Sequence, residues 1–282
     1  MRHWAKMVKA RERCAVRRRK KNEVSVAAWV VRELSFPTER SPMTPKPSSW
    51  DLRHRVSRAR TECSTKSRRS VANVRAANLT YLDRRALIDL ATLARQVGNT
   101  GGVIVEAGSA LGGSAIVLAA AKDPRTPLRL YDVFGTIPPP TDADGEAAAR
   151  RFEEISAGRS AGIGGDVYYG YRDDLVDEVR AEFCRAGLDP DGNEVSFHPG
   201  LFDDTLDVRE PVALAHLDCD WYDSVQVCLD RIWPNLVDGG TIVIDDYLHW
   251  EGCRRAVDDF VARTPDARVV RRSRIHLVKV AG

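Results

Sequence analysis

The sequence lacks two features that would point to a structural metal or a membrane. None of its 6 cysteines lies in a C-x-x-C pair or beside a histidine cluster, which excludes the usual zinc-binding spacings. No apolar run approaches the roughly 18–20 residues that a membrane-spanning helix needs. We therefore expect a cytoplasmic protein, away from membranes, whose cysteines are reduced and mostly buried.

Acidic residues are scarce in the first quarter of the chain. Residues 1–70 hold 20 lysines and arginines against 6 aspartates and glutamates, whereas the remaining residues hold 23 against 34. The apolar stretch that follows the basic start, Val24–Val31, is about eight residues long and has no convincing cleavage site, so it is a poor secretion signal.

We expect residues 1–70 to form a basic, disordered extension ahead of a folded domain over 71–282. The proline- and serine-rich stretch Pro37–Trp50 cannot bury enough apolar surface to offset its ordering entropy. Two other interpretations stay open: a leader upstream of a true start at Met43, or an arm that binds nucleic acid or a membrane surface. Without aromatic interleaving or amphipathic order, nucleic-acid binding is the less favoured interpretation.

Helical and strand patterns alternate from Val71 onward. A helical spacing runs over 79–98, and further helices are expected over 114–121, 173–186, 222–236 and 253–264. Apolar strands are expected over 103–105, 128–133, 194–198, 212–217 and 241–244. This order predicts an α/β fold with a Rossmann-like, doubly wound, mostly parallel sheet. The last two strands, 268–272 and 274–280, are too close for a helix between them and predict a C-terminal antiparallel hairpin.

The segment 136–170 interrupts this alternation with three consecutive prolines, an acidic alanine-rich helix and several glycines. A long insertion at the carboxyl edge of the sheet is a candidate lid over a ligand site. A solvated surface excursion is the alternative.

A glycine-rich loop follows the first strand, from Gly108 through Ser109 to Gly112-Gly113. Such a loop lets the backbone and helix N–H groups approach a ligand, so Gly108 and Ser109 are candidate cofactor contacts. It departs from the G-x-G-x-x-G pattern of dehydrogenases. Glu106 beside it suits a ligand that carries a cationic amino acid, such as the methionine part of S-adenosylmethionine.

Asp132 ends the second strand, where a carboxylate accepts hydrogen bonds from the hydroxyls of a ribose. Both NAD and S-adenosylmethionine carry that sugar, so Asp132 indicates an adenosine-type ligand without distinguishing the two. A turn or capping aspartate is the alternative interpretation.

Two acidic groups follow neighbouring strands: Asp218 and Asp220 after the fourth, and Asp245-Asp246 after the fifth. Carboxylates that meet at one sheet edge repel by roughly 4 kcal/mol per close pair, and a bound cation removes that cost. Oxygen ligands favour Mg²⁺ or another hard divalent cation over zinc. His249 lies just beyond and either faces the substrate or bonds a loop backbone.

These residues resemble the macrocin O-methyltransferase family of class I S-adenosylmethionine-dependent methyltransferases. The resemblance spans about Asn78 to Val280 and lies in the following blocks: Val105–Gly108, Gly112–Ser114, Asp132–Gly135, Gly200–Leu206, Leu217–Ser224, Ile244–Tyr247 and Gly252–Asp258. The chain departs from the family at Ser109-Ala110-Leu111, where a large residue and an arginine are common. Its basic extension also lies outside the family pattern.

The resemblance implies metal-dependent methyl transfer from S-adenosylmethionine to a sugar hydroxyl of a natural product such as an antibiotic, often in a homodimer. It implies metal binding by Asp218, Asp245 and Asp246. The cofactor contacts that it implies are Glu106, Gly108, Asp132 and the turn at Gly200–Phe202, near the adenine.

We expect Asp218, or less favourably His249, to accept the hydroxyl proton. Two rival hypotheses are a nicotinamide-dependent oxidoreductase of similar fold and an RNA methyltransferase that uses the basic arm. The glycine loop with Glu106 and the acidic strand ends weigh against the first.

Overall fold

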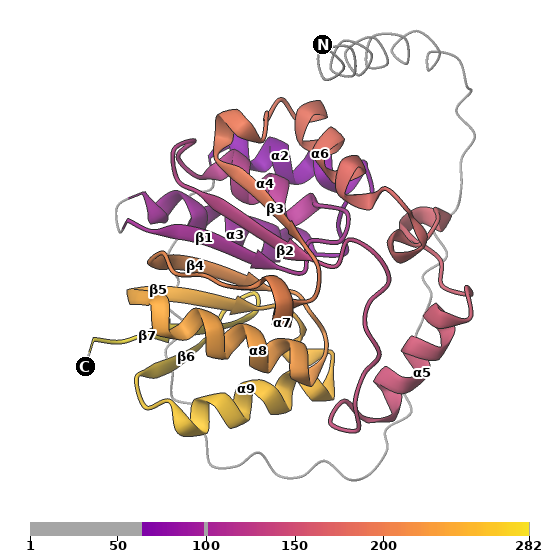
Figure 1. Cartoon of the computed structure of the whole chain (residues 1–282). Helices are drawn as coiled ribbons and strands as arrows, with labels where there is room; N and C mark the ends of the chain where they lie inside the picture. The colour runs from indigo at the N-terminus through magenta and orange to yellow at the C-terminus, as the bar shows by residue number, and fades with distance from the viewer. Residues whose placement is uncertain (1–63, 99–100, 282) are drawn as a thin grey trace, which may run out of the picture. The chain divides into compact units, whose positions relative to one another are not determined.

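A seven-stranded sheet forms the centre of the protein, with its strands in the order β3-β2-β1-β4-β5-β7-β6 (Figure 1). The structure is a computed structural model that describes residues 64–98 and 101–281. The strands have the following bounds: β1 Val103–Ala107, β2 Leu128–Asp132, β3 Val195–Pro199, β4 Val212–Leu217, β5 Leu236–Ile244, β6 Ala267–Arg271 and β7 Ile275–Lys279.

Strands β1 to β5 pair in parallel, and β7 pairs antiparallel with both β5 and β6. The predicted Rossmann-like class and its C-terminal antiparallel pair are therefore confirmed. The final strand does not sit at the edge: β7 is inserted between β5 and β6. The carboxyl ends of β1, β2, β4 and β5 meet along one edge, which is where a parallel sheet of this kind binds ligands.

Helices cover both faces of the sheet (Figure 1). One hydrophobic core lies under α2, α3, α4 and α6, with Leu87, Ile116 and Phe183 fully buried in it. The second lies under α8 and α9 and includes Leu229 and Phe260. The helices have the following bounds: α2 Thr65–Ala76, α3 Arg84–Val97, α4 Gly113–Ala121, α5 Gly145–Ser156, α6 Leu175–Arg185, α7 Phe202–Thr205, α8 Tyr222–Ile232 and α9 Glu251–Arg263.

Several element boundaries differ from the sequence prediction. The helix expected over 222–236 ends at Ile232, and β5 begins at Leu236 rather than at residue 241. The expected helix over 79–98 begins only at Arg84, because the Asp83 carboxylate accepts hydrogen bonds from the N–H groups of Arg85 (2.6 Å) and Ala86 (3.0 Å) and caps α3. Helix α2 begins at Thr65, before the expected domain start at residue 71, and packs against α3 and α4. The part of the chain before residue 64, with Met43 and the apolar stretch at Val24–Val31, lies outside the described residues.

The insertion over 136–170 contains α5 and two single-turn 3₁₀ helices, Ile163–Gly165 and Tyr169–Tyr171. Its two parts are tied together, since the Tyr171 hydroxyl donates to the carbonyl of Ile155 at 2.6 Å and accepts from the N–H of Ser160 at 3.2 Å. Further 3₁₀ turns have the bounds Asp191–Asn193, Trp233–Asn235 and Asp246–Leu248.

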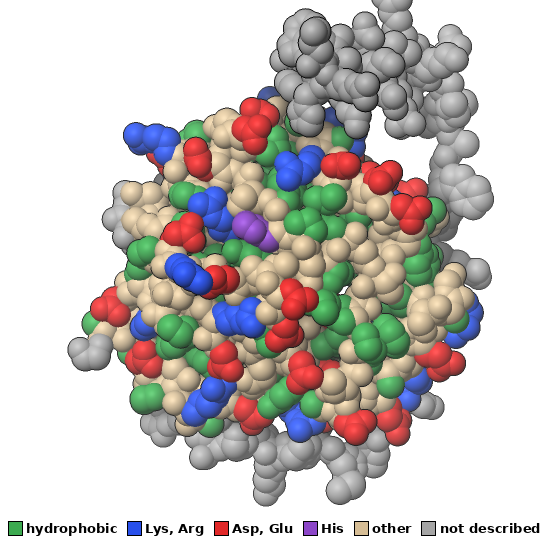
Figure 2. Space-filling model, viewed as in Figure 1, with side chains coloured by type: hydrophobic (Ala, Val, Ile, Leu, Met, Phe, Trp, Pro, Cys, Tyr) green, Lys and Arg blue, Asp and Glu red, His purple; other side chains and the backbone are tan. Residues whose placement is uncertain are grey.

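The described surface is mixed in charge. Figure 2 shows acidic and basic side chains interspersed over one face, without a broad field of either sign among the described residues. In the same part of the chain no helix is both long and apolar enough to cross a membrane. Three of its cysteines, Cys219, Cys228 and Cys253, are free and buried as expected, whereas Cys184 is free but exposed.

Candidate active site

The glycine loop after β1 lies directly against the end of β4. Gly108 has a φ of 88°, a backbone conformation that suits glycine, and a Cβ there would overlap the carbonyl of Asp218. The Asp218 N–H donates to the carbonyl of Ala107 at 2.9 Å. The sequence thus brings the predicted cofactor loop into contact with the first predicted metal ligand.

Asp132 fixes the conformation of this loop. Its Oδ2 accepts hydrogen bonds from the N–H groups of Ser109 (2.6 Å) and Ala110 (2.9 Å), and its Oδ1 accepts one from Phe134 (2.7 Å). Burial raises the pKa of Asp132, against the effect of these three N–H groups. Oδ1 keeps an acceptor position for the predicted ribose hydroxyl, and Asp132 lines the cavity described below.

Glu106 lies behind the loop, fully buried and outside the cavity lining. Its Oε2 accepts from the Ser109 hydroxyl at 2.9 Å, and its Oε1 lies 3.0 Å from Nδ1 of His216. Both oxygens therefore have protein partners, and Glu106 supports the loop through Ser109. Sequence reasoning missed His216 as its partner.

A cavity at the carboxyl edge of the sheet joins these elements. It is lined by Gly108, Ala110, Asp132, Val133, Gly135, Ile137, Pro138, Pro139, Thr141, Asp144, Tyr169, Leu201, Phe202, Asp203, Asp218, Cys219, Asp220, Trp221, Asp223 and Ser224. Of the predicted turn at Gly200–Phe202, Leu201 and Phe202 line the cavity. Gly200 supports the turn, since its N–H donates to the carbonyl of Asp132 at 3.0 Å.

The insertion supplies one wall of this cavity. The Pro138 carbonyl accepts a hydrogen bond from Nε1 of Trp221 at 2.9 Å. Asp144 is buried, and its Oδ1 accepts from the N–H of Tyr222 at 2.6 Å, at the start of α8, while its Oδ2 accepts from the N–H of Thr141 at 2.8 Å. Residues of the insertion therefore form part of the cavity wall. That the insertion acts as a lid over a bound ligand stays a prediction.

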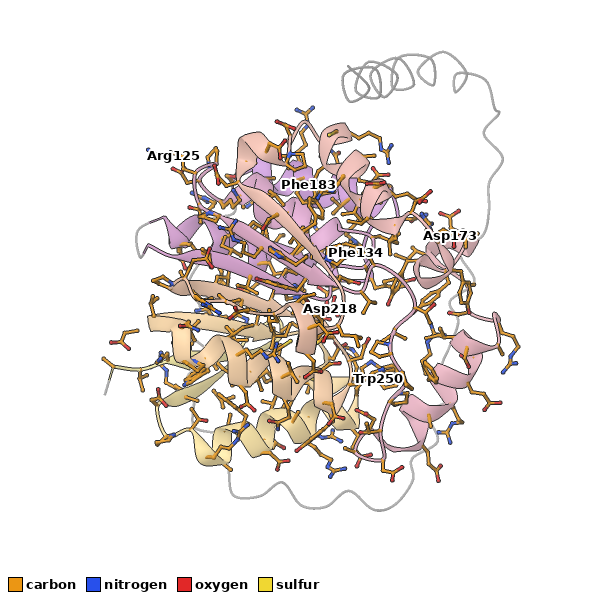
Figure 3. The ribbon with its side chains drawn as sticks, in the orientation of Figure 1. Arg125, Phe134, Asp173, Phe183, Asp218 and Trp250 are labelled. Atoms are coloured by element: carbon orange, nitrogen blue, oxygen red, sulfur yellow. The ribbon has the colours of Figure 1, made fainter. Side chains whose placement is uncertain are left out.

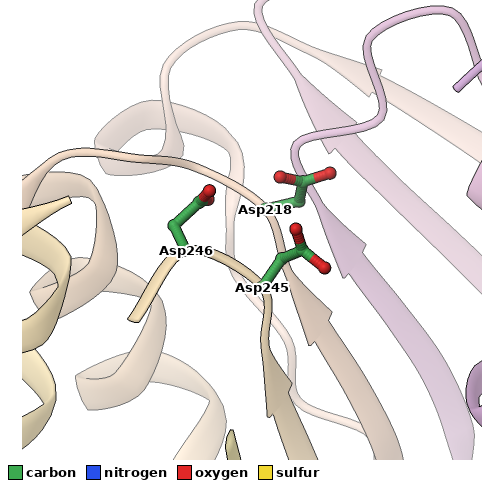
Figure 4. Close-up of side chains that lie close together, drawn as sticks. All are labelled: Asp218, Asp245 and Asp246. Carbon is green, nitrogen blue, oxygen red and sulfur yellow. The ribbon is translucent and has the colours of Figure 1, made fainter. Parts of the chain in front are cut away.

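The three predicted metal ligands converge (Figure 4). Asp218, Asp245 and Asp246 each offer a carboxylate oxygen, and these oxygens lie within 4.8 Å of one another. Figure 3 places Asp218 at the strand ends that face α5. Burial, followed by the neighbouring aspartates, raises the pKa of Asp218 and of Asp246 well above the usual range. We call these three residues the aspartate trio; the excess of negative charge suits a hard cation.

Arg274 is a neighbour of the trio that sequence reasoning missed. It lies in the turn between β6 and β7, and its Nε donates to Oδ1 of Asp245 at 2.6 Å. Its Nη1 donates to Oδ2 of Asp83 at 3.1 Å. A positive charge therefore lies at one side of the trio.

Asp220 is a further carboxylate in the cavity wall. Its backbone is left-handed, with a φ of 59°, and its N–H lies 3.3 Å from Oδ2 of Asp246. Burial raises the pKa of Asp220 to about 6, and the charge of Asp245 adds to the shift. Asp220 belongs to the acidic run expected after β4, but only Asp218 of that run was expected to bind the metal or accept the proton.

The structure does not bring His249 to the cavity. It is exposed, it is absent from the cavity lining, and its N–H donates to the carbonyl of Asp246 at 2.8 Å in a short turn. This position favours the loop interpretation over the catalytic one.

Comparison with known proteins identifies the family of the chain. The family model Macrocin-O-methyltransferase (TylF) matches residues 31–267. The match begins inside the basic segment that we expected to lie outside the family pattern, so that expectation was wrong for residues 31–70. Sequence relatives match over short stretches, about a third of each relative's own length.

One relative is 8-demethyl-8-(2,3-dimethoxy-alpha-L-rhamnosyl)-tetracenomycin-C 4'-O-methyltransferase of Streptomyces olivaceus, 41% identical over 31% of this chain and 33% of its own. Another is mycinamicin III 3''-O-methyltransferase of Micromonospora griseorubida, 37% identical over 29% of this chain and 32% of its own.

Solved structures share the fold. The O-methyltransferase NovP has 24% identity and a TM-score of 0.59, over 72% of this chain and 83% of its own. The calicheamicin methyltransferase CalS11 has 18% identity and a TM-score of 0.51, over 76% and 91%. Since the family model covers most of the sequence, the chain belongs to the macrocin O-methyltransferase family.

Proposed function

We propose that the protein transfers a methyl group from S-adenosylmethionine to a hydroxyl of a sugar or glycosylated natural product, with a hard divalent cation such as Mg²⁺ held by the aspartate trio. The observation that carries the proposal is the convergence of the trio beside the glycine loop, with Asp218 and Gly108 lining the same cavity. The rhamnosyl group in the name of one sequence relative supports the acceptor class.

The donor has a place in the cavity that fits its chemistry. Backbone at Gly108 can approach a ligand closely, Asp132 offers an acceptor for a ribose hydroxyl, and Leu201 and Phe202 offer apolar surface for a base. S-Adenosylmethionine supplies a sulfonium methyl group that a correctly placed oxygen can attack in line, and proximity contributes much of the rate.

The trio fits a cation because its carboxylates are crowded and partly desolvated. A bound divalent ion would lower the pKa of a coordinated alcohol and fix the position of its oxygen. Asp218, Asp245 and Asp246 would then be occupied as ligands, and their basicity would fall.

Asp220 is therefore the better proton acceptor. It lines the same cavity and lies outside the trio, so it would not be occupied as a metal ligand. We assign the base to Asp220 in place of the sequence-based choice of Asp218 or His249.

The first experiment tests transfer and metal together. Purified protein is incubated with labelled S-adenosylmethionine, Mg²⁺ and a panel of glycosylated metabolites, with and without prior chelation. The double variant Asp245→Ala/Asp246→Ala should lose transfer yet still bind the donor in calorimetry, whereas Asp238→Ala, an exposed aspartate on β5, should behave as wild type. Full activity of the double variant or of chelated enzyme would remove the metal from the proposal.

Family membership favours methyl transfer over a nicotinamide-dependent reaction, and calorimetry with NAD and with S-adenosylmethionine decides between them. The RNA methyltransferase alternative depends on residues outside the described part. A gel shift with RNA at several salt concentrations, on the full chain and on a chain that starts at residue 64, tests it. The homodimer that the resemblance implied stays a proposal, to be checked by light scattering.

A further inference from the structure

Arg274 places a largely buried positive charge beside the trio. Its side chain is 12% exposed and bridges two acids, Asp245 at 2.6 Å and Asp83 at 3.1 Å. Arginine stays protonated at any pH at which the protein folds, so this charge is permanent. It comes from the β6–β7 turn, which is distant in sequence from both acids.

The backbone of Asp245 is held by a bond in which Arg274 takes no part. Its N–H donates to the carbonyl of Leu217 at 2.9 Å, which extends the pairing of β4 and β5 by one residue. The backbone therefore holds Asp245 at the sheet edge. What Arg274 adds is charge: it offsets one carboxylate of a trio whose members otherwise repel one another.

A divalent cation among the same oxygens would be repelled by Arg274 and would compete with it for Asp245. The second acid gives Arg274 an alternative partner, because the exposed Asp83 accepts from Nη1 rather than from the Nε that bonds Asp245. Arg274 can thus release Asp245 without being left unpaired.

We propose that Arg274 is a built-in counter-cation of the aspartate trio, which stabilises the protein without metal and lowers its affinity for the divalent cation. The inference rests on the metal assignment in the proposed function. On this proposal Arg274 changes the affinity of the site for the metal without being one of its ligands.

The test compares Arg274→Met with wild type in thermal unfolding, after chelation and in saturating Mg²⁺, and in calorimetric titration with Mg²⁺. Removal of the charge should lower the Tm far more in chelator than in Mg²⁺, and it should tighten Mg²⁺ binding by about tenfold. Arg274→Lys keeps the charge and should retain an affinity close to that of wild type.

Arg272→Met is the matched control. Arg272 lies in the same turn but pairs with Asp89, at 3.6 Å, rather than with the trio. Its replacement should change the Tm equally with and without Mg²⁺ and leave the Mg²⁺ affinity unchanged.

The outcomes separate the inference from the function on which it rests. If Arg274→Met loses the same Tm in both conditions, binds Mg²⁺ more weakly, or shares its tighter binding with Arg274→Lys, the counter-cation role is wrong while the metal assignment stands. If the wild-type protein shows neither heat of binding nor a change in Tm with Mg²⁺, the metal assignment is wrong. The proposed competition between Arg274 and the cation is then wrong as well.

Discussion

Gly108 and Asp218 are in backbone contact: the space that a Cβ on Gly108 would need is filled by the Asp218 carbonyl. The loop predicted to hold the methyl donor and the strand end predicted to hold the cation are therefore one rigid unit. Any side chain at position 108 has to displace the start of the acidic run.

Gly108→Ala should consequently weaken donor binding and destabilise the fold by several kcal/mol, since a left-handed backbone strain of about 1–2 kcal/mol adds to the overlap. Gly158→Ala is the control: Gly158 has a φ of 70° but open space around its Cβ position, so only the strain is expected. Urea unfolding and calorimetry with S-adenosylmethionine check this. Equal losses in the two variants would contradict the contact argument.

Asp220→Asn should reduce kcat by about 10²–10⁴-fold, the usual contribution of a general base, with little change in donor affinity. In wild type, a base must be deprotonated to act, so log kcat/KM should rise with pH below the Asp220 pKa of about 6 and level off above it. A nearby cation moves this limb to lower pH. If Asp220→Asn retains both the wild-type kcat and the rise of log kcat/KM with pH, another residue is the general base.

The metal-free protein should lose stability as the pH rises from about 4 to neutrality. The pKa values of Asp218 and Asp246 are raised in the folded state, mainly by burial, so over this window the folded protein binds more protons than the unfolded chain. Acids with lowered pKa values, such as Asp83 and Asp89, act in the opposite sense, chiefly at lower pH.

Asp246→Asn removes one of the repelling charges. In chelator near neutral pH it should exceed wild type in free energy of unfolding, on the order of 1–2 kcal/mol, with a smaller gain near pH 5. Urea titrations at both pH values measure the difference, with Asp238→Asn as control. A variant less stable than wild type at neutral pH would show that Asp246 is not under net repulsion.

Asp144→Ala should detach the insertion from α8. The carboxylate caps α8 through the Tyr222 N–H and holds Thr141, so its loss should cost about 1 kcal/mol or more and raise the KM for the acceptor. Asp142→Ala, two residues away and exposed, is the control. Hydrogen exchange over 136–144 should increase in Asp144→Ala alone. Unchanged exchange would show that Asp144 does not hold the insertion against α8.

Site residues that lie at the ends of neighbouring strands could be predicted from the sequence. The strand Val212–Leu217 has its expected bounds, because a strand buried on both faces reads as an unbroken apolar run. The meeting of Asp218 with Asp245 and Asp246 followed from the same reasoning, since neighbouring parallel strands bring their carboxyl ends together. Their selection as the metal ligands, without Asp220, was implied by the family resemblance.

Partners set by tertiary packing could not be predicted. Nothing local to Glu106 indicates that His216, 110 residues away, lies beside its carboxylate in the core. Arg274 meets Asp245 only because β7 is inserted next to β5, whereas a hairpin alone allows either strand to take that place. The left-handed backbone of Asp220 could not be predicted either, because no glycine occupies that position.

The insertion of β7 between β5 and β6 also has a consequence for biosynthesis. A chain emerging from the ribosome makes β1 to β5 first, yet the flank of β5 stays unpaired until Ile275–Lys279 has left the exit tunnel. Arg274 directly precedes β7, so the acidic edge of a nascent molecule acquires its internal positive charge only when that strand joins the sheet. Before then, protons and cations from the solution are the available means of neutralising it.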